Sequence, residues 1–209
     1  MGKGIKEKEK LRPREHALFE RRLQIRNAAV TCILAKGYHA TGMRDIASHA
    51  KVSLGNLYNH FPSKHEILLE IARSEAEAIE PLVDLLHREG EESEILHDFI
   101  KSYSVLSDDE DSWALFLEII AEAARNEEIS DAFIRTRNTL SIALQELIER
   151  GKGRGSFHHS VPSDSTAQFV LDLIEGASFR RTSDPKATPD REGALEAFIQ
   201  AALESSHGQ

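Results

Sequence analysis

Residues 37–64 read GYHATGMRDIASHAKVSLGNLYNHFPSK, and this stretch decides which fold the chain is expected to adopt. Thr41 and Ser53 can each cap the start of a short helix, because their side-chain oxygens accept hydrogen bonds from helical N–H groups. Ala47 is small where two helices would approach each other, and Leu57 supplies an apolar side chain between them. The stretch therefore predicts two short helices joined by a tight turn, a helix-turn-helix.

Helical spacing of apolar residues continues on both sides of this stretch. The upstream residues that share one helix face are Ile25, Ala28, Ala29, Cys32 and Ile33. Downstream, a capping box of Ser63 and Glu66 starts a long helix, which Pro81 would bend or restart. Further helices are expected at about 94–106, 111–125, 128–150, 163–180 and 191–205. Because strand patterns are nearly absent, we predict an all-α fold, with the glycine-rich residues 151–155 as a mobile end of their helix.

Charge is distributed unevenly along the chain. The net charge of −9 argues against a polyanionic partner, yet residues 1–64 hold 13 Lys and Arg against 5 Asp and Glu. The remaining residues hold 13 basic and 30 acidic side chains. The basic part is therefore the candidate nucleic-acid-binding region, with a solvated basic surface that has no partner as the alternative. Residues 3–22 form a basic arm that can reach a neighbouring groove or, as we favour, add nonspecific attraction.

Several classes of site and location are disfavoured by composition. No apolar run approaches the roughly 20 residues of a membrane-spanning helix, and the Lys-rich start lacks an apolar signal segment, so a cytoplasmic protein without a membrane partner is expected. Cys32 has no second thiol with which to form a disulfide or a zinc cluster, and is expected to be a small buried residue. His87, His97 and the pair at 158–159 are scattered, so neither a metal site nor a cofactor is expected.

The second short helix would present its outward side chains to DNA. Gly55 removes bulk where the helix end would approach the duplex, and Asn56 can pair bidentately with an adenine edge. The other residues that would project outward or donate to phosphate oxygens are Ser53, Leu54, Tyr58, Asn59, His60 and Lys64. Each of these polar residues taken singly is an ordinary surface group, but their clustering inside the basic region favours a DNA-binding surface.

The runs 37–47 and 52–64 resemble the DNA-binding head of the tetracycline-repressor (TetR) family, and the likeness extends over roughly residues 22–72. This resemblance implies a three-helix head, a fourth helix that links it to a helical ligand-binding domain, and a symmetric dimer on a palindromic double-stranded operator. The positions that the family uses on DNA are, by resemblance, Thr41, Arg44, Ser53, Leu54, Gly55, Asn56, Tyr58, Asn59, His60 and Lys64. Residues 122–128 and 173–176 also resemble the C-terminal domain of one broad branch of the family, without identifying an effector.

Two positions depart from the family pattern. Gly42 stands where a hydroxyl residue is commoner, which removes one expected phosphate contact. Lys51 occupies the turn position usually held by glycine, and a left-handed backbone there would carry modest strain.

Beyond residue 64 we expect a helical domain for ligand binding and dimerisation. The aromatic and apolar residues of the effector-pocket hypothesis are Phe99, Tyr103, Trp113, Phe116, Ile120 and Phe133, for which ordinary core packing is the alternative. The last two helices are apolar over more than one face, so we expect each to cover both its own core and a partner subunit. The residues predicted for this interface are Phe169, Val170, Leu173, Ile174, Ala177, Leu195, Phe198, Ile199 and Ala202; the alternative is that these are central core helices.

We therefore predict a basic arm at 1–20, a helix-turn-helix domain at 21–64 and a ligand-binding and dimerisation domain at 65–209. The expected function is sequence-specific DNA-binding regulation of transcription, as a repressor that a small-molecule effector releases. No catalytic motif is present, so an enzyme is not expected. An all-helical adaptor that binds other proteins is the remaining alternative, which explains the acidic surface but not the basic cluster.

Overall fold

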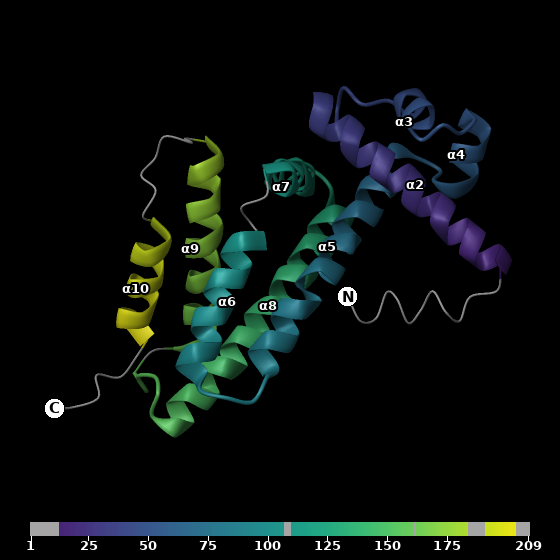
Figure 1. Cartoon of the computed structure of the whole chain (residues 1–209). Coiled ribbons are helices and arrows are strands. Elements are labelled where there is room, and N and C mark those ends of the chain that lie inside the picture. Colours follow the sequence, from purple (N-terminus) through teal and green to yellow (C-terminus); the bar gives the residue numbers. More distant parts are fainter. Residues whose placement is uncertain (1–12, 107–109, 161, 184–190, 204–209) are drawn as a thin grey trace. The chain divides into compact units, whose positions relative to one another are not determined.

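The computed structural model describes residues 13–106, 110–160, 162–183 and 191–203, and every element in these ranges is a helix, as predicted (Figure 1). These helices are α2 (Pro13–Lys36), α3 (Met43–His49), α4 (Leu54–His60), α5 (Lys64–His87), α6 (Glu92–Leu106), α7 (Glu110–Ala123), α8 (Glu127–Arg154), α9 (Ser163–Ser183) and α10 (Arg191–Leu203). The chain divides into an N-terminal unit, residues 1–72, and a C-terminal unit, residues 73–209. The division lies within α5, later than residue 64, since Ile67, Leu68 and Ile71 at its start are buried. Most of the basic arm, residues 1–12, lies outside the described residues.

The N-terminal unit is built on the apolar stripe expected of its first helix. Ile25 and Ile33 of α2 are buried, and so are Ile46 of α3, Leu57 of α4 and Phe61 directly after it. Because α3 and α4 are too short to be stable alone, this shared core holds them. The predicted helix-turn-helix is confirmed.

The turn between α3 and α4 is tight and contains a left-handed lysine. The Val52 amide donates to the Ala47 carbonyl at 3.0 Å, which closes the turn. Lys51 has φ 53°, the only positive φ of a non-glycine residue in the described part of the chain. A left-handed residue with a Cβ atom costs about 1–2 kcal/mol, so the strain expected for this position is present.

Two of the three predicted helix caps are confirmed. The Ser53 hydroxyl accepts from the Asn56 amide, and the Ser63 hydroxyl accepts from the Glu66 amide, each at 3.1 Å. The prediction for Thr41 is wrong, because Gly42 is the residue that precedes α3. The Gly42 amide donates to Asp45 Oδ2 at 2.8 Å.

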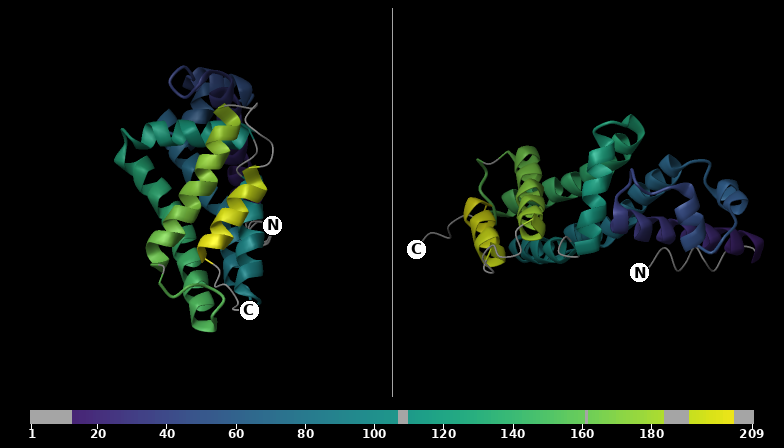
Figure 2. Two further views of the ribbon diagram at one scale, coloured as in Figure 1. Left: turned by 90° about the vertical axis from the view of Figure 1, so that its left-hand side faces the viewer. Right: turned by 90° about the horizontal axis from the view of Figure 1, so that it is seen from above.

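The C-terminal unit has one apolar core beneath α6, α8, α9 and α10, which lie side by side (Figures 1 and 2). Phe99, Leu144, Phe157 and Ile174 are among its fully buried side chains. The second half of α5 joins this core, and Pro81 does not end that helix. Among the described residues, no helix combines the length and apolar character that a bilayer crossing needs.

The end of α8 differs from the expectation. The helix does not stop at Gly151 but runs on to Arg154, and Gly155 then closes it with φ 82°. Gly151 is buried against Phe157, whose ring occupies the space that a Cβ atom would need. The glycine is therefore required for close packing rather than for mobility.

The two glycines of this last turn give a matched test of that packing. Gly151→Ala should lower the free energy of unfolding by about 1–3 kcal/mol, because the buried Phe157 ring cannot move aside. Gly153→Ala should raise it by about 0.5–1 kcal/mol, because its Cβ would meet nothing within 4 Å. Urea denaturation measures both, and equal effects at the two sites would contradict the packing argument.

Candidate nucleic-acid interface and effector site

Helix α4 and the start of α3 present exposed side chains in the N-terminal unit. Arg44, Ser53, Gly55, Tyr58 and Asn59 are exposed, and these are predicted DNA-contact residues. A Cβ atom at Gly55 would meet nothing within 4 Å, so the protein's own packing does not require glycine there. Glycine weakens a helix, so its presence here needs another reason. Close approach by a partner provides one, because glycine has no side chain in the way. Leu54, Asn56 and His60 are half-buried beside this surface.

The side-chain oxygen of Asn56 is turned inward. Its Oδ1 is buried and accepts no hydrogen bond among the described residues. A bidentate contact with adenine needs both the oxygen and the NH₂ group, so the side chain must rotate outward to make it. Rotation would hydrate an unsatisfied acceptor, which favours the movement.

Thr41 does not offer its hydroxyl to DNA. The residue is 1% exposed, and Oγ1 donates to the carbonyl of Gly37 at 2.8 Å and lies 3.1 Å from the carbonyl of Cys32. It thus ties the loop before α3 to the end of α2. The sequence-based assignment of Thr41 as a DNA contact is corrected by this burial.

Lys64 is also used inside the N-terminal unit. Its ammonium lies 2.6 Å from the Tyr38 carbonyl, 2.9 Å from that of Thr41 and 3.4 Å from that of His39. It also lies 4.2 Å from the centre of the Tyr38 ring. Three carbonyls satisfy the three donors of an ammonium group, so the predicted phosphate contact gives way to a structural role.

Sequence reasoning missed a second such clamp at Arg22, which it counted as part of the basic arm. The Arg22 guanidinium donates to the His60 carbonyl at 2.7 Å and to Glu70 at 2.9 Å, and it lies over the Phe61 ring at 4.2 Å. It therefore fixes the end of α4 against α2. Burial, together with the charges of Arg22 and Arg21, lowers the pKa of His60, so this side chain is neutral at neutral pH. No spacing pattern in the sequence marks such side chain to carbonyl contacts.

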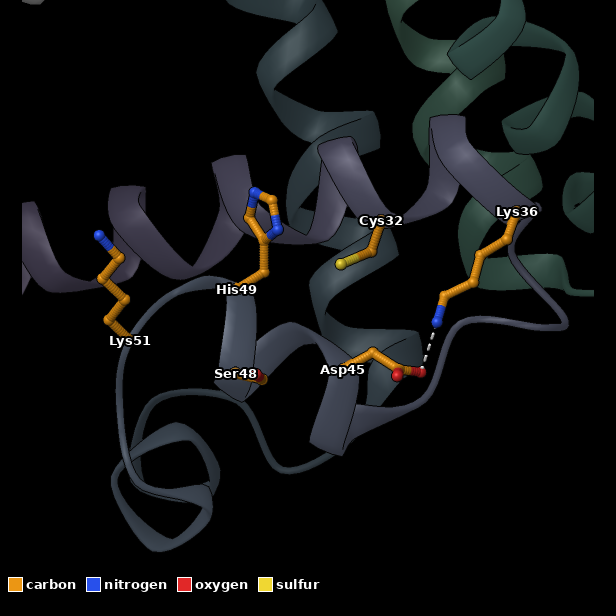
Figure 3. Close-up of a pocket in the computed structure, with 6 residues that line it drawn as sticks. All are labelled: Cys32, Lys36, Asp45, Ser48, His49 and Lys51. Carbon is orange, nitrogen blue, oxygen red and sulfur yellow. Dashed lines mark ion pairs between the residues drawn. The ribbon is translucent and has the colours of Figure 1, made fainter.

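A hollow of about 520 Å³ lies between α2 and α3, lined by Cys32, Lys36, Asp45, Ser48, His49 and Lys51 (Figure 3). Lys36 and Asp45 form an ion pair across it at 2.9 Å. The thiol of Cys32 is buried, as predicted, and burial raises its pKa above the usual value. The thiol is therefore protonated and a poor nucleophile at neutral pH.

Five of the six residues of the effector-pocket hypothesis fall into two groups in the C-terminal unit. Trp113 stacks on Phe116 with ring centres 4.6 Å apart, and Phe116 lies 5.6 Å from Phe133. Phe99 stacks on Tyr103 at 5.8 Å. Phe99 is fully buried in the core, so the core alternative holds for it. Ile120 is exposed.

Tyr103 belongs to a polar cluster that sequence reasoning did not find. Its hydroxyl donates to Glu175 at 3.0 Å, and Arg137 lies 3.4 Å from the same carboxylate. Arg137 also pairs with Asp172. These contacts join α6, α8 and α9. Burial raises the pKa of Glu175, and burial next to that carboxylate raises the pKa of Tyr103.

The predicted dimer residues separate into buried and exposed sets. Val170, Ile174 and Ile199 are buried in the subunit's own core, so they cannot contact a partner, and their assignment is corrected. Phe169 and Phe198 are 65% and 62% exposed. The other predicted residues are Leu173 and Ala202, which are exposed, and Ala177 and Leu195, which are half-buried. Large apolar side chains exposed on one face are typical of an interaction surface.

Comparison with known proteins identifies the family. Residues 25–71 match the family described as "Bacterial regulatory proteins, tetR family", and residues 93–207, more than half of the chain, match "BetI-type transcriptional repressor, C-terminal". The chain belongs to the TetR family. It is therefore a helix-turn-helix transcriptional repressor that binds DNA. Members of this family are regulators and generally not enzymes.

Relatives of this TetR-family chain cover most of its length. The transcriptional regulator UidR of Escherichia coli is 26% identical over 74% of this chain and 78% of its own, and the repressor Rv1474c of Mycobacterium tuberculosis is 25% identical over 92% and 97%. Salmonella enterica GusR matches in structure with a TM-score of 0.74 at 22% identity, over 88% of this chain and 95% of its own. A regulator of Saccharomonospora viridis, solved in complex with choline, matches with a TM-score of 0.77 at 25% identity, over 89% and 98%.

Gly55 gives a direct test of the TetR-family DNA surface. Gly55→Ala should leave the fold intact or slightly more stable, because alanine favours a helix and its Cβ meets nothing. Affinity for operator DNA should fall about tenfold, roughly 1.4 kcal/mol, because the methyl group would stand where the duplex approaches. Fluorescence anisotropy with labelled DNA measures the change, and Gly153→Ala is the matched control. Unchanged affinity in Gly55→Ala would place DNA on another surface.

Glu175 should make the stability of the C-terminal unit depend on pH. Since its folded pKa is raised, its contribution is fully present below the usual value of 4.5 and is lost as pH rises through the folded pKa. Glu175→Gln keeps an acceptor for Tyr103 and cannot titrate. The unfolding free energy of the wild type, relative to this variant, should therefore fall from pH 4 to pH 7. Urea denaturation at several pH values checks this, with the exposed Glu94→Gln as control; a rising difference would contradict it.

Proposed function

We propose that this regulator reads a palindromic operator with the outer face of α4, one helix from each subunit of a homodimer. The observation that carries the proposal is Gly55, a helix-weakening residue that the internal packing does not require. Ser53 and Tyr58 lie exposed beside it and can donate to phosphate oxygens, while Asn59 and the rotated Asn56 can reach base edges. The basic arm would add nonspecific attraction, and the site of action would be the cytoplasm.

The proposed homodimer forms through the outer faces of α9 and α10. Phe169 and Leu173 lie one turn apart on α9, and Phe198 and Ala202 have the same spacing on α10. All four are exposed, which supports a cover by a second copy of the same face. Such a pair of chains would present its α4 helices to successive major grooves, about 34 Å apart or a multiple of that.

The proposed effector site lies around Trp113, Phe116 and Phe133 in the C-terminal unit. Helix α8 carries Phe133 from this aromatic cluster, and one turn later it carries Arg137, which pairs with Asp172 and Glu175 of the dimer helix α9. A shift of α8 on effector binding can therefore move α9. A coupling of about 1–3 kcal/mol would change operator affinity by roughly 5- to 150-fold.

The DNA-binding proposal is tested by selecting bound fragments from genomic DNA and measuring affinity against salt. The logarithm of the association constant for DNA should fall linearly with the logarithm of the salt concentration, because each phosphate contact releases counterions. A protein-interaction adaptor, the competing hypothesis, would bind no fragment selectively at low ionic strength. The absence of selective binding would contradict the proposal that this chain reads an operator.

The dimer face is tested by introducing charge into it. Phe198→Glu should convert the dimer to a monomer at micromolar concentration and abolish cooperative operator binding, because a buried unpaired carboxylate opposes association. Leu18→Glu, which adds the same charge at an exposed apolar position in the N-terminal unit, should remain dimeric. Sedimentation equilibrium distinguishes the two, and a dimeric Phe198→Glu variant would exclude this face.

A further inference from the structure

Trp113 carries a hydrogen-bond donor that the described part of the chain does not satisfy. The residue is 5% exposed, and its indole Nε1 is buried with no acceptor among the described residues. An indole N–H can only donate, so neither a donor nor a purely apolar group can satisfy it. A buried donor left unpaired is unfavourable, and native structures rarely keep one without a reason.

The surroundings of this donor are aromatic and partly open. Phe116 stacks on the indole, and Phe133 packs against Phe116. Both phenylalanine rings are half-buried, while Leu117 and Ile120, one and two turns after Trp113 on α7, are exposed. A ligand with a flat or cyclic apolar body can therefore stack on these rings, and it reaches the buried Nε1 when the side chains that cover this atom move.

Charges nearby disfavour an anionic ligand. Helix α7 contains four acidic residues and no Lys or Arg. Arg137, one turn from Phe133 on α8, is already shared by the carboxylates of Asp172 and Glu175. Because two carboxylates already neutralise this cation, the charges favour a neutral ligand over an anionic one.

We infer that the effector is a neutral cyclic compound whose carbonyl oxygen accepts a hydrogen bond from Trp113 while its apolar body lies against Phe116 and Phe133. This assignment rests on the proposed effector site and names the chemistry that the site takes. Trp113 then sets specificity, because an analogue without the oxygen leaves the indole N–H unpaired.

The chain has a single tryptophan, so one ¹⁵N–¹H indole resonance reports on this donor. Acetophenone should move that resonance downfield and slow its hydrogen exchange. α-Methylstyrene, in which C=CH₂ replaces C=O, should bind about tenfold more weakly without this shift. Equal binding of the two compounds, no binding of either at millimolar concentration, or an indole N–H already protected in the free protein would each overturn the assignment.

Trp113→Phe provides the variant that keeps an aromatic ring and removes the donor. In ligand-detected saturation-transfer experiments it should bind the two compounds equally within about twofold. A retained preference for acetophenone would contradict the role of the indole.

The ligand titrations contain no DNA, so their outcome does not depend on whether the chain binds an operator. Selective acetophenone binding by a chain that ignores DNA would uphold the donor site and refute the regulator. Salt-dependent operator binding without selectivity between the compounds would do the reverse.

Discussion

The geometry of the DNA-binding unit depends on one half-buried cation, the ammonium of Lys64. It stands at the first residue of α5 and is held by backbone carbonyls of the loop that precedes α3. Since α4 ends only a few residues before Lys64, this single side chain closes a ring that contains the whole helix-turn-helix. Arg22 closes the same ring from α2 through the carbonyl at the end of α4. Two short helices that could not fold alone are in this way held at a fixed angle.

This use of basic side chains explains where sequence reasoning about the interface succeeded and where it failed. The helix-turn-helix followed from cap residues and apolar spacing, which are local properties, and the cap at Ser53 was found for the same reason. Thr41 and Lys64 were misassigned because the sequence does not show whether a hydroxyl or an ammonium group faces solvent or a backbone carbonyl. Only three-dimensional contacts distinguish the two, and a count of basic residues assigns both kinds to the nucleic acid.

In the C-terminal unit the limit of sequence reasoning was different. The apolar width of α9 and α10 predicts that each helix covers two surfaces, yet the pattern could not tell which side of each helix the subunit itself covers. Phe169 and Val170 are adjacent in sequence and opposite in exposure. The ionic contacts of Arg137 were invisible for another reason, since its partners lie more than thirty residues away on another helix. Patterns of spacing report neighbours on one helix only.

The left-handed backbone at Lys51 shows that this turn does not carry the residue that would make it most stable. A glycine there would release the strain, but it would also remove an exposed cation from the DNA-binding unit. The N-terminal unit thus gives up a small part of its folding free energy and keeps a positive charge in return. Compromises of this kind are typical of surfaces shaped by recognition, where the most stable sequence and the best-binding sequence are different.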